Sequence, residues 1–457
     1  MAVIRRPGTR QRLLRARRIG TTFGRVYLGI KANQLMDRRR GGAADRRRWS
    51  RFHRKSGHSI HEAAIDLGGL ILKGCQFLGA RADVLPPEYV ETLAGLQDRV
   101  PPHPFEEIRS RVELELRSPL ENVFVEFSET PVASASLAQV HAARLPDGRR
   151  VAVKVQYPGI EDLVRSDLAN LGTLFRAVGF IERDFDLMPL IREIGSHVPL
   201  ELDFVNEGIN AERIESFFKD RDDLEVPRVH WDLTTRRVLV SDFVDGIKIS
   251  DVAGLARAGI DPRKVMRSLV EAYCEQIFVH GFFHADPHPG NLMVRPSSEA
   301  DGCYRVVFLD FGQAKQLPSS FRKAVVEFSG ALIGGRPDDM AGALLELGFE
   351  TRNDSTESLR TLSATLLDVA TNLRHQTYLD PDIIRDAGKE LPRMIRENPI
   401  VRIPSHLVLL GRVLGLLSGL GRTLNVKLDM LRVILPYAAT GAPGGLPKTR
   451  STDDNRD

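Results

Sequence analysis

Cysteine and long apolar runs are both scarce in this 457-residue chain. The three cysteines, Cys75, Cys274 and Cys303, lie far apart and are odd in number, which argues against a disulfide framework and provides no zinc-ligand spacing. No run of eighteen apolar residues occurs. The nearest, over residues 403–420, is interrupted by His406 and Arg412 and predicts a buried amphipathic helix. We therefore expect a cytoplasmic protein without a transmembrane helix. If the protein meets a membrane, we expect the contact to be peripheral.

Acidic residues are scarce at the start of the chain. Residues 1–51 contain sixteen Arg and Lys but two Asp and Glu, a net charge of +14, so the other residues carry −10 of the total of +4. Such segments occur in lipid-binding helices, nucleic-acid-binding arms, organelle presequences and solvated extensions. We expect residues 1–58 to be a basic extension, either disordered or on a membrane surface. Further along the chain, no aromatic residues interleave with a basic face, so no nucleic-acid partner is expected.

Hydrophobic spacing predicts helices first and then a mixed region. Ile60, Ala64 and Leu67 recur at helical intervals, and residues 59–120 are assigned to a helical extension. The next residues predict strands over 140–145, 151–155 and 237–244, and a helix over about 198–218. The first two strands flank an Asp-Gly pair at residues 147–148, which is typical of a hairpin turn.

The predicted elements add up to an α+β protein with two lobes. Residues 121–246 are assigned to a small mixed β-sheet lobe and residues 247–435 to a larger helical lobe with a short strand over 305–309. The end of the chain, residues 436–457, is rich in Gly, Pro and charge and is predicted to be a disordered tail.

Two short motifs carry the most specific chemistry in the chain. Residues 284–291 read H-A-D-P-H-P-G-N and D-F-G follows at residues 310–312, which fits the H-x-D-x-x-x-x-N and D-F-G pair of protein kinases. We predict that Asp310 and Asn291 hold Mg²⁺ against the phosphates of ATP, and that Asp286 orients or deprotonates the attacking hydroxyl or water. An isolated D-F-G is more often a turn, but the ordered combination favours catalysis.

The strand over residues 151–155 contains a candidate phosphate-binding lysine. Strand alternation places Ala152 and Lys154 on the face opposite the valines. In kinases such a lysine contacts the α- and β-phosphates and is held by a glutamate of the following helix, for which Glu207 is the best candidate. Alone, Lys154 would more often be a solvent-exposed edge lysine. Its place upstream of both catalytic motifs favours nucleotide binding and catalysis.

A glycine-rich phosphate loop is missing ahead of this lysine. Residues 132–140 read V-A-S-A-S-L-A-Q-V, and small side chains still let backbone approach a phosphate, with less freedom than glycine gives. The predicted nucleotide contacts are Ala133, Ser134, Ala135, Ser136, Ala152, Lys154, Asp242 and Val244. No A-P-E follows the D-F-G, so the usual docking platform for a protein substrate is not predicted.

Together these motifs resemble the UbiB/AarF family of atypical protein-kinase-like proteins over about residues 60–425. The resemblance also rests on S-A-S-L-A-Q-V-H at residues 134–141, Q-D-R-V-P-P at 97–102 and F-H-A-D-P-H-P-G-N at 283–291. It implies a two-lobed kinase-like fold that binds MgATP between its lobes, an ATPase more than a protein kinase. It also implies a role in isoprenoid-quinone synthesis or lipid homeostasis.

The same resemblance implies a regulatory lid. The family's Lys-x-Gly-Gln signature appears here as K-G-C-Q at residues 73–76, with cysteine in place of glycine, and its Glu-x-Asp signature as E-L-D at residues 201–203. By resemblance these segments cover the active site and disfavour ordinary protein phosphorylation, with Lys73 paired to Glu201. The implied lid residues are Lys73, Gln76, Glu201 and Asp203.

Two other function classes remain open. A small-molecule kinase of the aminoglycoside or choline kinase type shares the H-x-D-x-x-x-x-N loop, but it needs an acceptor site among residues 330–435 and leaves the helical extension unexplained. A nucleotide-binding pseudokinase scaffold would use ATP as a conformational ligand, although the intact catalytic residues argue against complete loss of chemistry. The expected partners are ATP, anionic membrane lipid or isoprenoid-quinone precursors, and a biosynthetic protein complex.

Overall fold

The structure, a computed structural model, describes residues 9–40, 45–79, 85–94, 96, 102–181, 195, 201–297, 302–351, 356–373, 400–402, 404–426, 428, 433–434 and 436–437. The chain divides into two compact units. Unit 1 is Met1–Gly208 with Arg228–Phe243, and unit 2 is Ile209–Pro227 with Val244–Asp457. This division differs from the predicted domains, because residues 209–227 cluster with unit 2 and the N-terminal extensions cluster with the mixed lobe.

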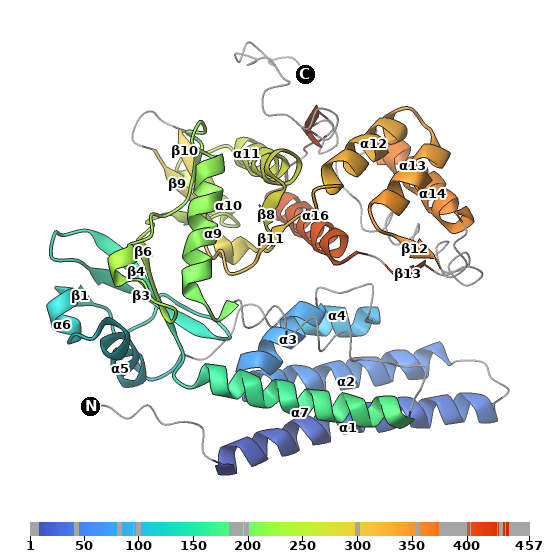
Figure 1. Cartoon of the computed structure of the whole chain (residues 1–457), viewed down its shortest axis with the longest axis horizontal. Coiled ribbons are helices and arrows are strands. Elements are labelled where there is room, and N and C mark those ends of the chain that lie inside the picture. Colours follow the sequence, from blue (N-terminus) through green and yellow to red (C-terminus); the bar gives the residue numbers. More distant parts are fainter. Residues whose placement is uncertain are drawn as a thin grey trace. The chain divides into compact units, whose positions relative to one another are not determined.

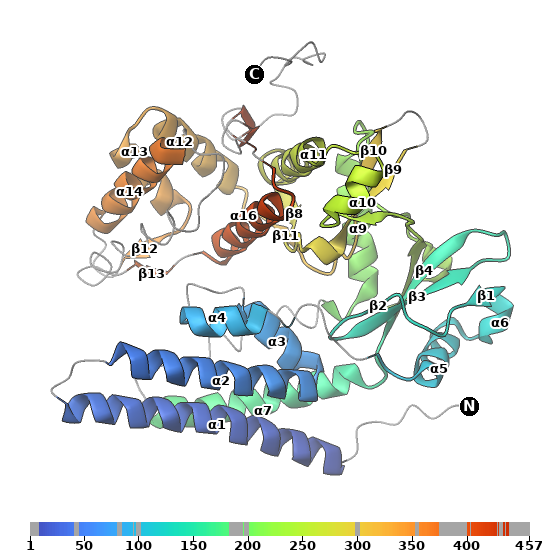
Figure 2. The ribbon, with the colours of Figure 1, turned by 180° about the vertical axis from the view of Figure 1, so that it is seen from behind.

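Unit 1 begins with long helices. The long helices α1 (Thr9–Arg39), α2 (Arg46–Leu67) and α7 (Ile160–Ile181) run side by side in Figures 1 and 2. The shorter helices α3 (Gly69–Gly79) and α4 (Pro87–Ala94) pack against them. Residues 9–39 and 46–58 of the predicted basic extension are helical in the structure. Residues 1–8 lie outside the described ranges.

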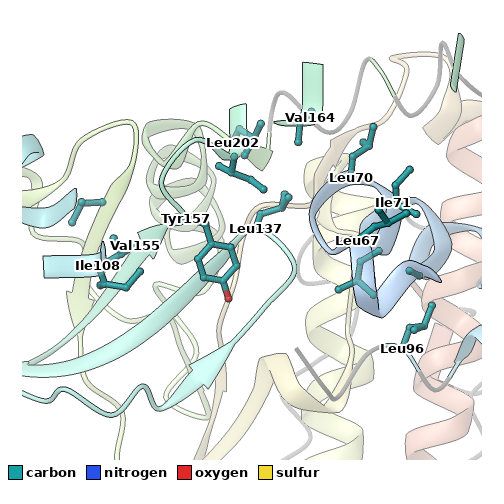
Figure 3. Packing of buried hydrophobic residues seen from close by; sticks show 14 of the residues in the cluster. Leu67, Leu70, Ile71, Leu96, Ile108, Leu137, Val155, Tyr157, Val164 and Leu202 are labelled. Atoms are coloured by element: carbon teal, nitrogen blue, oxygen red, sulfur yellow. The ribbon is translucent and has the colours of Figure 1, made fainter. Parts of the chain in front are cut away.

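A bend separates α2 from α3. Gly68 and Gly69 have φ values of 58° and 52°, a left-handed region that favours glycine and ends α2 before α3 begins. Figure 3 shows Leu67, Leu70 and Ile71 of this bend within a buried hydrophobic cluster. The cluster extends to side chains of α7 and of the sheet, so the N-terminal helices share one core with the sheet of unit 1.

A five-stranded antiparallel sheet forms the other part of unit 1. The order is β1 (Glu126–Phe127), β3 (Ala138–Arg144), β4 (Arg150–Gln156) and β6 (Val238–Asp242), and β2 (Ala133–Ser134) also pairs with β3. The predicted β3–β4 hairpin is confirmed, and Gly148 adopts a φ of 87° at its turn. Short helices flank the sheet: α5 (Phe105–Leu116), α6 (Leu120–Val123) and η2 (Trp231–Leu233).

Two sheets of unit 2 lie next to helix α11 (Pro262–Cys274), and a third pairs β12 (Glu350–Thr351) with β13 (Ile400–Arg402). The larger of the first two has the order β5 (Leu224–Glu225), β10 (Tyr304–Phe308), β9 (Leu292–Pro296) and β7 (Ile247–Lys248), and the smaller pairs β8 (Phe282–His284) with β11 (Ala314–Gln316). Helix α11 continues as a π-helical turn, η3 (Glu275–His280), and ends at Gly281 with a φ of 64°.

The remaining elements of unit 2 are mostly helical: α10 (Val252–Arg257), η4 (Pro289–Asn291), α12 (Phe321–Ile333), α13 (Pro337–Glu346), β12 (Glu350–Thr351), α14 (Glu357–Leu373), β13 (Ile400–Arg402) and α16 (Ser405–Thr423). The predicted amphipathic helix is α16, which buries Val413, Leu417 and Leu420. Among the described residues, no helix has the length and hydropathy needed to span a membrane. Residues 438–457 of the predicted tail lie outside the described ranges.

Candidate active site

Lys154 on β4 is held by Glu207 on α9 (Phe204–Phe217). The Lys154 Nζ lies 2.7 Å from Glu207 Oε1 and 2.9 Å from Oε2, and 5.2 Å from the centre of the Phe204 ring. Both side chains are largely buried, so the pair is partly desolvated and its geometry is well defined. The predicted pairing is confirmed within unit 1, whereas its role in phosphate binding stays a prediction.

The residue before α9 fixes the start of this helix. Asp203 Oδ1 accepts a hydrogen bond from the Val205 N–H (3.1 Å), and its Oδ2 lies 3.2 Å from Arg236 Nε. Asp203 therefore caps the helix that carries Glu207. This contact orients the lysine partner one turn later.

The two implied lid signatures meet through one ion pair. Lys73 Nζ lies 2.7 Å from Glu201 Oε2, which confirms that pairing, while Gln76 donates to the Leu96 carbonyl at 3.0 Å. Cys75, in the place of the family glycine, is buried, and burial raises the pKa of its thiol to about 12. The cysteine is thus a packing side chain without thiolate character. Of the segment over residues 97–102, only Pro102 lies within the described ranges.

The alanine-rich loop forms a tight turn between β2 and β3. The Ala135 N–H donates to the Ala138 carbonyl (2.8 Å), and the Tyr157 hydroxyl donates to the Ala135 carbonyl (3.0 Å). Burial raises the pKa of Tyr157 to about 12, so the hydroxyl stays a donor. Ala133 and Ala135 are exposed, whereas Ser136 is buried. The centre of the loop is therefore held by the hydrogen bonds of Ala135, and the loop exposes small alanine side chains to solvent.

Two of the predicted nucleotide contacts, Asp242 and Val244, lie at and just after the end of β6 and differ in environment. Asp242 closes β6 in unit 1, and its Oδ1 lies 2.7 Å from the Nε2 of the partly buried His230 ring. Val244 is buried and begins the second stretch of unit 2. Ala152 lies on β4 two residues before Lys154 and is half-buried, on the face that alternation predicted.

In unit 2, Asn291 and Asp310 lie at the same end of the β9–β10 ladder. Leu292 pairs with Phe308, and the Leu309 N–H donates to the Asn291 carbonyl at 2.8 Å. Asp310 has a φ of 56°, a left-handed conformation that is uncommon for a residue with a Cβ. Strained backbone of this kind clusters at functional sites.

The buried His284 joins the H-x-D-x-x-x-x-N and D-F-G motifs. A carbonyl only accepts hydrogen bonds, so His284 Nε2 donates to the Asp310 carbonyl (2.7 Å) and Nδ1 accepts from the Tyr273 hydroxyl (3.0 Å). Burial lowers the pKa of His284, which keeps the imidazole neutral and agrees with this tautomer. His284 therefore holds the backbone of the D-F-G aspartate in place.

Asn291 and Asp310 fit a nucleotide-bound Mg²⁺ as oxygen donors. Asn291 Nδ2 donates to the Asp286 carbonyl (3.2 Å), which turns the amide oxygen the other way, and Asp310 Oδ1 accepts from the Gly312 N–H (3.2 Å). Mg²⁺ is usually held by one or two protein oxygens together with water and substrate phosphates. The part of the chain that the structure describes contains no group of three or more His, Cys, Asp or Glu suited to a metal held by protein alone.

Sequence reasoning missed two contacts to these motifs. Arg412 on α16 donates from Nη2 to Asp286 Oδ1 (2.8 Å) and from Nη1 to Gln313 Oε1 (3.3 Å). Asn210 on α9 donates to the Phe311 carbonyl (3.1 Å). The first pair is 126 residues apart, so motif spacing cannot indicate it. The available signal was Arg412 itself, a charged residue within a mostly apolar stretch.

Comparison with known proteins places these motifs in a family. Residues 95–341, more than half of the chain, match the family model of the ABC1 atypical kinase-like domain. The chain belongs to the ABC1 family. One ABC1 relative, AarF domain-containing protein kinase 1 of Gallus gallus, is 40% identical over 273 residues, which are 60% of this chain and 52% of the relative. The probable protein kinase UbiB of Marinobacter nauticus is 34% identical over 393 residues, which cover 83% of this chain and 69% of that protein.

The fold of the ABC1 chain is also found among solved structures. The Mycobacterium tuberculosis protein Rv3197, solved with erythromycin, superposes with a TM-score of 0.58 at 23% identity, covering 80% of this chain and 91% of that protein. Together with the mixed helices and sheets, this confirms the predicted α+β protein-kinase-like fold with N-terminal helices. The chain spans about half the length of the curated relatives that it matches first.

Proposed function

We propose that this ABC1-family chain binds MgATP and transfers or hydrolyses its γ-phosphoryl group. The Lys154–Glu207 ion pair carries the proposal, because a lysine held by both oxygens of a buried glutamate has its charge fixed for phosphate binding. Asp310 and Asn291 would hold Mg²⁺, which neutralises phosphate charge when bound. Asp286 would orient the attacking hydroxyl or water.

The test is phosphate release from MgATP by the purified full chain, with Asp286→Asn and Asp310→Asn as paired variants. We expect both substitutions to lower kcat by about 100-fold or more, and Asp310→Asn also to weaken Mg²⁺-dependent nucleotide binding in calorimetry. Nucleotide binding without turnover in the wild type would favour the pseudokinase scaffold. Turnover that appears only with an added aminoglycoside or choline-type acceptor would favour the small-molecule kinase.

The resemblance favours hydrolysis over protein phosphorylation, and a role in isoprenoid-quinone or lipid metabolism. The Lys73–Glu201 pair supports the first part, since it joins the two signatures whose presence is implied to disfavour protein substrates. We propose that isoprenoid-quinone precursors and a biosynthetic protein complex are partners of this chain.

An anionic membrane surface is a further proposed partner, and α1 supplies the observation. Its exposed leucines lie among exposed arginines, a composition suited to the headgroup region of an anionic bilayer: Leu13, Leu14, Leu28 and Leu35 with Arg17, Arg18 and Arg25. We expect the chain to float with vesicles that contain anionic lipid and not with neutral vesicles. A Leu14→Glu/Leu28→Glu variant should lose this binding, and equal flotation of both proteins would contradict the proposal.

A further inference from the structure

We propose that Arg412 is a positioning residue for Asp286, which fixes one carboxylate oxygen so that the other is directed to the phosphoryl acceptor. The inference rests on the proposed phosphoryl-transfer function and adds a residue to it. Arg412 Nη2 lies 2.8 Å from Asp286 Oδ1, and the side chains are 10% and 18% exposed, respectively. A hydrogen bond between two charged groups is short and strongly directional.

The largely buried guanidinium of Arg412 has its charged and polar partners at Asp286 and Gln313. A guanidinium removed from water is stable only with charged or polar partners. Here Nη2 and Nη1 have such partners in Asp286 and Gln313, while the buried Nε has no hydrogen-bond partner. The neighbouring Val413 is fully buried, so core packing of α16 sets where the guanidinium lies.

Arg412 also links the two catalytic motifs. Gln313 directly follows the D-F-G, and its carbonyl accepts from the Ala285 N–H (2.8 Å), the residue before Asp286. The backbone carbonyl of Asp286 is held by Asn291, but that contact leaves the carboxylate torsion unfixed. Arg412 supplies the missing constraint. A misplacement of about 1 Å at a reacting centre can cost on the order of 100-fold in rate.

The experiment compares Arg412→Ala and Arg412→Lys with the matched control Arg422→Ala, an exposed arginine on the same helix. MgATP turnover, nucleotide Kd and thermal stability are measured for each full-length variant. We expect Arg412→Ala to lower kcat about 10- to 100-fold with nucleotide Kd changed less than about threefold, because Arg412 acts on orientation and not on nucleotide binding. Arg412→Lys should retain more activity, and the control should match the wild type.

Chemical rescue separates positioning from folding. Added guanidinium ion at millimolar concentration should restore part of kcat in Arg412→Ala and none in an Asp286→Asn/Arg412→Ala double variant. Unchanged or increased kcat in Arg412→Ala overturns the inference, and so does a loss of kcat that follows thermal stability and is not rescued. A wild type that binds MgATP without turnover overturns the proposed function and this inference together, whereas an active wild type with a normal Arg412→Ala overturns the inference alone.

Discussion

The imidazole of His284 is fully buried between the Tyr273 hydroxyl and the Asp310 carbonyl. Burial lowers its pKa from the ordinary value of 6.5, so the folded protein keeps the ring neutral while the unfolded chain protonates it below that pH. The unfolded state then binds more protons, and stability falls as the pH drops below 6.5. One such group contributes a loss of up to about 1.4 kcal/mol per pH unit.

We therefore expect His284→Gln to flatten the dependence of unfolding free energy on pH between about 7.5 and 5.5. Denaturant unfolding at several pH values measures this slope. His58→Gln changes an exposed histidine on α2 and serves as the control, which should keep the wild-type slope. Equal slopes for wild type and His284→Gln would show that the ring has the same pKa in the folded and unfolded states, which would contradict this prediction.

Helices α1 and α7 are tied by a buried ion pair. Arg15 Nη2 lies 2.6 Å from Asp167 Oδ2, Arg15 also donates to the Leu67 carbonyl, and Asp167 is fully buried. Burial raises the pKa of Asp167 even with the arginine beside it. An unpaired carboxylate there would be costly, because a buried charge depends on its partner.

Removing the arginine should thus loosen the packing of the N-terminal helices. We expect Arg15→Met, which keeps most of the apolar stem, to lower the free energy of unfolding by about 3–5 kcal/mol near neutral pH. The loss should shrink on acidification, since a protonated Asp167 carries no charge. Arg18→Met removes the exposed Arg18–Asp66 pair and should change stability far less. Similar losses for both variants, measured by denaturant unfolding, would refute a special role for the buried pair.

Each unit of the whole molecule carries a different part of the proposed machinery. Unit 1 holds the Lys154–Glu207 pair together with Lys73 and Glu201, and unit 2 holds the H-x-D-x-x-x-x-N and D-F-G motifs. Because Lys73 Nζ lies 2.7 Å from Glu201, two residues before the cap of α9, the N-terminal helices are coupled to the helix that carries Glu207.

Breaking that coupling should alter the activity of the whole chain. We expect Lys73→Ala to change kcat for MgATP by about threefold or more, or to permit self-phosphorylation, which incorporation of labelled phosphate measures. Lys55→Ala, an exposed lysine on α2, is the matched control. Identical kinetics and no labelling in Lys73→Ala would remove the lid from the proposal.

The sequence by itself determined the local structure and the order of the motifs. Strand alternation predicted the half-buried face of Ala152 and Lys154, and the Asp-Gly pair predicted the β3–β4 hairpin. These features depend on backbone preferences and on periodic burial within a few residues, which the order of the residues encodes directly.

Only the tertiary structure decided which distant side chains meet. Gln76 binds the Leu96 carbonyl, and Arg412 reaches Asp286 across 126 residues. Arg15 meets Asp167 from a segment whose charge alone also fitted a disordered extension. Such contacts depend on the path of the whole chain and on the burial that excludes water from each charge. The spacing of residues along the sequence predicts neither of these.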